Sequence, residues 1–242
     1  MIFPTQGVLL SRLKYSDSKL ILKIFTCEFG LQSYLFYHSG ASKNKFKLNL
    51  LQPMYLLDLQ VYHKEKSELR KIKEISPAVV YKTIPFNIYK QTLSLFLAEF
   101  TSKILQENQT DKELFYYIFN SMKLLDKAEV RTVNNFHVLF LYKLTKFLGI
   151  MPDNNYSLSR KIFDLKAAKF IIGYPNHKAF FDEKTGRKFH ELITEQSLVE
   201  DDLKLSNQER RKLLRGIIDF YNIHLNRPGK LKSLEILAQV FS

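Results

Sequence analysis

The feature that most constrains the fold is a change in the spacing of apolar residues between Pro77 and Pro85. Before it, apolar and polar residues alternate in short runs, with the period of two that is typical of strands. After it, apolar residues recur every three or four positions, as on the buried face of a helix. The 242-residue chain is therefore predicted to be α+β, with a β domain at 1-78 and a helical domain at 79-242.

Five strands are predicted before this change, separated by turn residues: Gly7–Leu13, Lys19–Thr26, Gln32–Tyr37, Met54–Tyr62 and Leu69–Ile75. An antiparallel unit of this size usually closes into a small barrel, because closure removes its exposed edges. The oligonucleotide-binding (OB) barrel is the commonest five-stranded solution. We therefore expect an OB-type β-barrel.

Helical spacing and capping signals divide the rest of the chain. We predict helices at 87–107, from a Thr110-x-x-Glu113 capping box onward, at 133–148, from a second capping box at Ser206-x-x-Glu209 to Leu225, and at 231–241. The segment 153–200 shows turn signals and no regular period, and it is predicted to be irregular.

The charge balance narrows the choice of partners. The chain has 37 Lys and Arg against 24 Asp and Glu, a net charge of +13, which favours nucleic acid or an anionic membrane surface. A single cysteine, Cys27, excludes an internal disulfide framework. The start of the chain lacks the pattern of a signal peptide, and no apolar run is long enough to span a membrane. We expect a soluble, cytoplasmic protein.

The barrel region offers basic and aromatic side chains that suit single-stranded nucleic acid, which is held by a basic groove and by aromatic faces that stack on bases. The candidates are Arg12, Lys14, Tyr15, Lys19, Lys23, Tyr34 and the cluster Lys43, Lys45 and Lys47. The alternative is that the alternating lysines form a solvated strand face and that Tyr34 is a core residue. For each single aromatic residue the core is favoured, and for the lysine cluster nucleic acid is favoured.

Residues arranged for catalysis are scarce. The six histidines show no metal-ligand spacing, and the chain has no glycine-rich loop for nucleotide phosphates. The run Glu200-Asp201-Asp202 leaves open a metal-dependent nuclease, although adjacent acids usually form a solvated turn. We expect no enzymatic activity, and a helical adaptor that does not bind nucleic acid is a further alternative.

Several strings, in this order, resemble the RecO family of bacterial recombination mediators. They are Gly7-Val8-Leu9-Leu10 through Tyr15-Ser16-Asp17, Phe25-Thr26-Cys27-Glu28-Phe29-Gly30-Leu31, Leu51-Gln52-Pro53 with Leu56-Leu57-Asp58-Leu59, Leu114-Phe115, and His224-Leu225 with Leu231-Lys232-Ser233. The resemblance covers essentially the whole chain.

This resemblance implies a DNA repair and recombination mediator associated with the nucleoid. It would bind single-stranded DNA, with double-stranded DNA as a further candidate, anneal complementary strands and help RecA load. Its implied protein partners are RecR and the acidic, Phe-terminated tail of the single-strand-binding protein. For that tail, whose ring needs an apolar pocket rimmed by cations, the candidates are Lys143, Lys146, Phe147, Arg211 and Arg215.

One feature departs from the family pattern. Many members carry a four-cysteine zinc site in the C-terminal domain, whereas this chain has no cysteine after Cys27 and only His177 and His190 in the corresponding segment. A structural zinc ion needs four nitrogen or sulfur ligands. We therefore predict no zinc and no other cofactor, and we expect phenylalanines to hold the segment instead: Phe163, Phe170, Phe180, Phe181 and Phe189.

Overall fold

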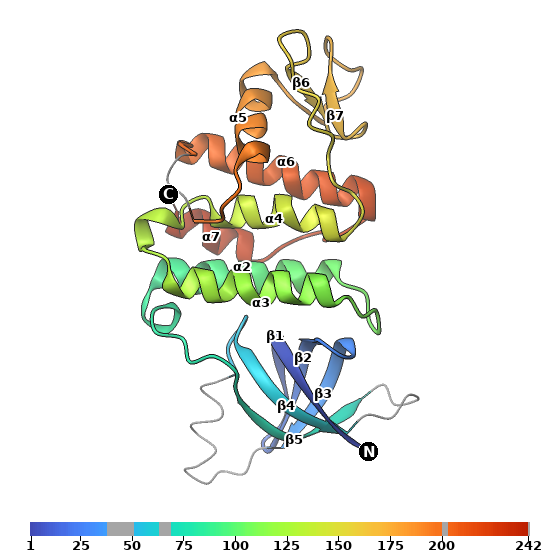
Figure 1. Ribbon diagram of the computed structural model, residues 1–242, viewed down its shortest axis with the longest axis vertical. Helices are drawn as coiled ribbons and strands as arrows, with labels where there is room; N and C mark the ends of the chain where they lie inside the picture. The colour runs from blue at the N-terminus through green and yellow to red at the C-terminus, as the bar shows by residue number, and fades with distance from the viewer. Residues whose placement is uncertain (38–50, 63–68, 200–202, 242) are drawn as a thin grey trace. The chain divides into compact units, whose positions relative to one another are not determined.

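The computed structural model describes residues 1–37, 51–62, 69–199 and 203–241 (Figure 1). The chain forms two compact units, Met1–Asp126 and Lys127–Ser242. Within the described ranges, none of the helices has the length and apolar character needed to cross a bilayer.

The first unit begins with the closed five-stranded barrel that the sequence predicts. Its strands are β1 (Ile2–Ser16), β2 (Lys19–Thr26), β3 (Gly30–Tyr37), β4 (Leu56–Tyr62) and β5 (Arg70–Pro77). They are ordered β1-β2-β3-β5-β4, and every neighbouring pair is antiparallel except β3 and β5. This arrangement confirms the OB-type barrel.

The first strand is longer than its sequence pattern predicts. Its N-terminal half pairs with β4, from Ile2 opposite Tyr62 to Val8 opposite Leu56, and its C-terminal half pairs with β2. Gly7 lies where these two pairings overlap, and a Cβ atom there would stand 2.6 Å from the side chain of Ile24. A glycine therefore lets the shared strand pass close to β2.

Two helices complete the first unit, α2 (Ile88–Ile104) and α3 (Lys112–Lys127), after the short 3-10 turn η1 (Ile84–Phe86). Helix α2 lies against β1. The predicted capping box at Thr110 is wrong by one position: the Asp111 carboxylate accepts the Leu114 N–H at 2.9 Å. Aspartate accepts such a bond as readily as threonine, so the residue next to the predicted cap takes its place.

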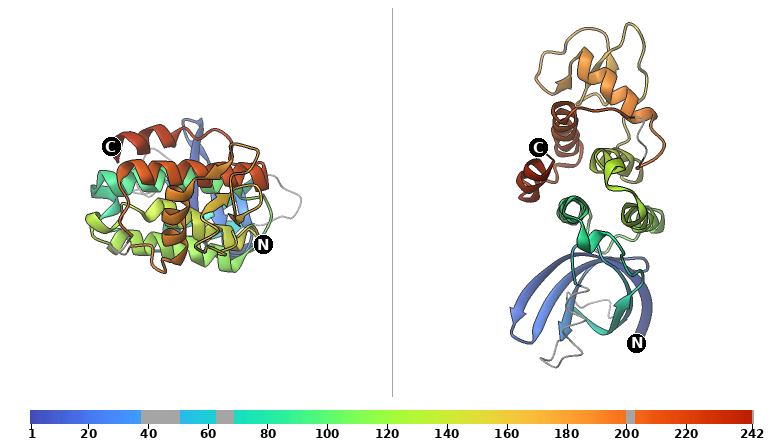
Figure 2. Two further views of the ribbon diagram at one scale, coloured as in Figure 1. Left: turned by 90° about the horizontal axis from the view of Figure 1, so that it is seen from above. Right: turned by 90° about the vertical axis from the view of Figure 1, so that its left-hand side faces the viewer.

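The second unit is mostly helical (Figure 2). It contains η2 (Val130–Thr132), α4 (Phe136–Phe147), α5 (Glu183–Thr194), α6 (Asn207–Leu225), α7 (Ser233–Val240) and a small sheet of β6 (Ile162–Asp164), β7 (Lys169–Ile171) and β8 (Phe180–Phe181). The capping box at Ser206 and Glu209 is confirmed. Helix α5 and the sheet correct the prediction of an irregular 153–200 segment. Each of these strands has only two or three residues, which is too short for alternation to be recognised, and α5 has few apolar residues.

Phenylalanine rings form the core of this small lobe. Phe163 lies 5.0 Å from Phe170 and 4.6 Å from Phe189 between ring centroids, and Phe181 lies 5.1 Å from Phe189. Phe180, also predicted to belong to this core, is only half-buried, and its ring contacts Tyr174 instead. Among the described residues, no group of three or more His, Cys, Asp or Glu side chains could hold a metal ion. Asp201 and Asp202, the candidate nuclease acids, lie outside the described residues.

Candidate functional sites

The outward face of β2 and β3 carries basic and aromatic side chains together. Strand pairing places Lys19 opposite Tyr37 and Lys23 opposite Ser33. The Lys19 Nζ atom lies 5.4 Å from the centre of the Tyr37 ring, and this ring is 49% exposed. Lys23 Nζ stands 3.9 Å from a carboxylate oxygen of Glu107. Two candidate lysines and an exposed ring therefore share one face.

Tyr34, in contrast, cannot contact DNA. Its pairing partner is Leu22, and both side chains are fully buried in the core of the barrel. Burial raises the pKa of Tyr34 to about 12. We therefore correct the prediction that Tyr34 offers a stacking face: the exposed ring on β3 is Tyr37, three residues later. Strand alternation could have identified Tyr37, because positions 34 and 37 point to opposite faces.

The remaining barrel candidates lie near the turn between β1 and β2. Arg12 pairs with Leu22 and Lys14 with Leu20, so both side chains are on the inward face of the sheet. Both are nevertheless exposed, because they lie near the end of the strand. Lys14 forms an ion pair with Asp17 at 2.7 Å. Tyr15 is 63% exposed at a break in the strand register. Lys43, Lys45 and Lys47 lie outside the described residues.

Carboxylates gather on another face of the same barrel. Glu28, Asp58 and Glu74 line a cavity of about 470 Å³ beside β1, β4 and β5. Cys27 lies at the same cavity, and burial raises the pKa of its thiol. Glu28 pairs with Lys112 at 3.0 Å and Glu74 with Lys73 at 3.9 Å, so part of this negative charge is compensated.

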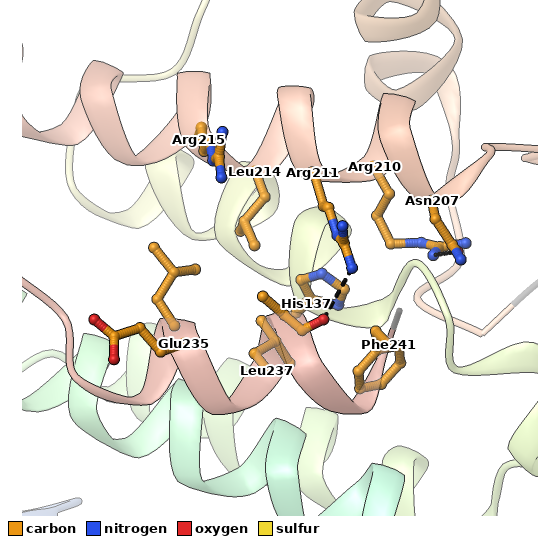
Figure 3. Close-up of a pocket in the computed structure, with 11 residues that line it drawn as sticks. His137, Asn207, Arg210, Arg211, Leu214, Arg215, Glu235, Leu237 and Phe241 are labelled. Carbon is orange, nitrogen blue, oxygen red and sulfur yellow. Dashed lines mark hydrogen bonds between the residues drawn. The ribbon is translucent and has the colours of Figure 1, made fainter.

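In the second unit, a cavity of about 190 Å³ lies between α6 and α7 (Figure 3). Leu214, Leu237 and Phe241 form its apolar surface, and Arg211 and Arg215 project from α6 toward it. The Arg211 Nη2 group donates a hydrogen bond to the Ala238 carbonyl at 2.9 Å. Arg210 and the carboxylate of Glu235 also line the cavity, so three guanidinium groups stand against one carboxylate. This excess of positive charge beside an apolar floor suits an anionic ligand that carries an apolar side chain.

The other predicted partner residues do not line this cavity. Lys143 donates from Nζ to the carbonyls of Glu195 and Gln196, at 2.8 and 2.6 Å, and Lys146 and Phe147 are likewise absent from the lining. The two lysines of α4 are therefore not part of this cavity, because α4 reaches it through His137 near its other end. Burial and the charge of Arg210 lower the pKa of His137 to about 3, so this ring is neutral near pH 7.

Sequence reasoning did not identify His137 and the residues of α7 as part of this cavity. Tertiary packing decides which helices contact each other, and neither the histidine nor the short apolar run of α7 carries a motif that would indicate a pocket.

Comparisons with known proteins point to the same family over both units of the chain. Residues 1–81 match the family model "Recombination protein O N terminal", and residues 85–169 match "Recombination protein O C terminal". Among curated relatives named "DNA repair protein RecO", those of Flavobacterium johnsoniae, Azobacteroides pseudotrichonymphae and Phocaeicola vulgatus are 34%, 32% and 31% identical to this chain. Each alignment covers 100% of both chains.

Proposed function

The chain belongs to the RecO family of DNA repair proteins, and from that premise we propose that it is a non-enzymatic recombination mediator. In this proposal it binds single-stranded DNA, anneals complementary strands and helps RecA load onto strands coated by the single-strand-binding protein. RecR is a further proposed partner.

The observation that carries the proposal is the outward face of β2 and β3. Lys19 and Lys23 can neutralise backbone phosphates, and Tyr37 offers an exposed ring beside them. Stacking a base on such a ring contributes about 1–3 kcal/mol. OB folds commonly bind oligonucleotides on the face of strands 2 and 3. Asp58 of β4 and Glu74 of β5 lie elsewhere on the barrel.

The cavity between α6 and α7 supports binding of the acidic tail of the single-strand-binding protein. A terminal Phe ring would pack against Leu214 and Leu237, while Arg211 and Arg215 would pair with carboxylates. Charge-assisted hydrogen bonds of this kind are about twice as strong as neutral ones. This assignment replaces Lys143, Lys146 and Phe147 with residues of α7.

An annealing assay without ATP tests the main proposal. We expect the protein to accelerate pairing of complementary strands, and we expect Lys19→Ala/Lys23→Ala to slow it. Lys166→Ala/Lys169→Ala, which removes the same charge from exposed positions of the lobe, should anneal like the unmodified protein. Metal-dependent cleavage of the strands would favour the nuclease instead, and the absence of salt-dependent DNA binding would favour the adaptor.

A further inference from the structure

A second cavity in the second unit, of about 360 Å³, shares Arg210 with the cavity between α6 and α7 but has a more polar wall. Three cationic side chains line it, those of Arg131, Lys204 and Arg210, together with polar groups of Thr132, Asn134 and Asn135. Among the described residues that form its wall, none carries a carboxylate. The cations come from separate segments of the chain, before α4, before α6 and within α6. Three segments of the chain therefore each place a positive charge at this cavity.

Arg210 is the buried member of this group, with 7% of its surface exposed. Its Nε donates to Asn135 at 3.0 Å, its Nη1 to Asn207 at 2.8 Å, and its Nη2 to the Leu205 carbonyl at 3.1 Å. All three acceptors are neutral. Over the part of the chain that the structure describes, Arg210 has no ion pair.

A guanidinium cannot lose its proton under ordinary conditions, so Arg210 keeps its charge inside the fold. Burial lowers its pKa, and the neighbouring Arg211 lowers it further, since two like charges repel. A buried charge is costly unless an opposite charge accompanies it. Of the five N–H donors of a guanidinium, three are used by the neutral acceptors. Two N–H groups remain beyond these three bonds, and Arg210 lines the cavity.

The rim of the cavity adds two adaptable cations. Lys204 is exposed, and the side chain of Arg131 is 75% exposed while its Nε bonds to Glu129 at 2.8 Å. Arginine and lysine are the side chains that most often bind phosphate, arginine through paired N–H groups and lysine as a point charge. The wall is mostly polar, with Leu203 and Leu205 as its apolar members.

We propose that the cavity formed by Arg131, Lys204 and Arg210 binds a phosphate group. The oxygens of a phosphate accept from donors in several directions, which matches cations from three segments. The phosphate can belong to a DNA backbone, to a 5′ end or to a small phosphorylated compound. The site lies in the second unit and does not depend on DNA binding by the barrel.

The test is thermal unfolding of the full chain in sodium phosphate and in sodium chloride at equal ionic strength. A ligand that binds only the folded state raises Tm, so we expect a higher Tm in phosphate. Arg131→Ala/Lys204→Ala should lose this increase, and calorimetry should show phosphate binding about tenfold weaker or more. Lys166→Ala/Lys169→Ala should keep the increase, which separates specific binding from a general salt effect.

Two oligonucleotides identify the source of the phosphate. If a 5′-phosphorylated strand displaces inorganic phosphate better than its 5′-hydroxyl twin, the site binds a strand end. Equal displacement indicates the backbone, and no displacement indicates a small phosphorylated compound. Each of these results supports the proposal.

Three results would overturn it. One is an equal effect of phosphate on the unmodified protein and on Arg131→Ala/Lys204→Ala. Another is a Tm in phosphate that is no higher than the Tm in chloride. The acids at 200–202 lie outside the described residues, and Glu200→Gln/Asp201→Asn/Asp202→Asn tests them as an internal counter-charge. We expect this variant to bind phosphate at least as well as the unmodified protein. Phosphate binding that appears only in this variant would contradict the proposal.

Discussion

At the scale of single residues, Asp126 fixes the connection between the barrel and the helices of the first unit. Its carboxylate accepts the backbone N–H of Lys82 at 2.9 Å, of Thr83 at 2.8 Å and of Ile84 at 2.9 Å. The ammonium of Lys90, which is itself buried, donates to the Asp126 carbonyl at 3.0 Å. One side chain near the end of α3 therefore satisfies three donors of a segment some forty positions earlier.

Asp126→Asn should destabilise the protein by about 1–3 kcal/mol at pH 7, because a neutral amide accepts these bonds less strongly and offers one oxygen in place of two. Burial alone would raise the pKa of Asp126, but the N–H bonds from Lys82, Ile84 and Thr83 outweigh it and lower the pKa below 3.8. The unfolded chain thus binds the proton more tightly, so this stabilisation is complete above about pH 4 and is lost as the pH falls through the folded pKa.

Urea unfolding at several pH values measures this effect. The gap between the unmodified protein and Asp126→Asn should narrow in acid. Glu129→Gln removes an exposed carboxylate that pairs with Arg131, and it should change stability by no more than about 1 kcal/mol. A gap that stays constant down to the lowest pH would contradict the assigned role of the charge.

At the scale of elements, the sequence predicts most of the barrel because alternation of apolar residues is a local signal. The prediction from sequence fails where packing against a neighbouring element decides which secondary structure forms. Residues 2–6 become part of β1 because β4 pairs with them. Helix α5 forms although few of its residues are apolar, since Phe189 and Leu192 reach the lobe core. The cavity between α6 and α7 depends on the packing of these two helices, which the spacing of apolar residues does not predict.

The lobe of β6, β7, β8 and α5 should depend on ring packing and not on a metal. Phe163→Ala removes a fully buried ring and should cost about 3–5 kcal/mol. Phe180→Ala, which removes a half-buried ring outside that cluster, should cost less. A chelator should leave Tm unchanged, because the chain has one cysteine. One zinc ion per chain in elemental analysis would refute this prediction.

At the scale of the whole molecule, the charge of +13 predicts DNA binding that weakens steeply with salt. The logarithmic slope for single strands is about 0.7 per phosphate neutralised. Lys43→Glu/Lys45→Glu/Lys47→Glu should reduce both the affinity and the slope, measured by fluorescence anisotropy. Lys166→Glu/Lys169→Glu/Lys178→Glu, a matched change in the lobe, should leave both unchanged. Equal binding by the first variant would place the DNA surface elsewhere.

Mutation should also separate the two binding activities, which we assign to different units. Arg211→Glu/Arg215→Glu should abolish binding of a peptide with the acidic, Phe-terminated tail, because the charge of two of the three arginines at the cavity is reversed. Binding to bare single-stranded DNA should persist, since we assign it to the barrel. Lys184→Glu/Arg187→Glu, an equal change at exposed positions of α5, is the control. Equal loss of both activities would make the helical unit part of the DNA surface, and intact peptide binding would move the pocket.

The hydrogen bonds to Asp126 determine where the chain can be truncated without loss of folding. The barrel ends with β5 at Pro77, yet the segment that follows gives three backbone N–H groups to a carboxylate near the end of α3. A fragment truncated shortly after the barrel would leave those donors unsatisfied and strip α2 from β1. The shortest fragment that folds on its own is therefore expected to run to residue 126 or beyond, so the barrel should be expressed and crystallised together with its two helices.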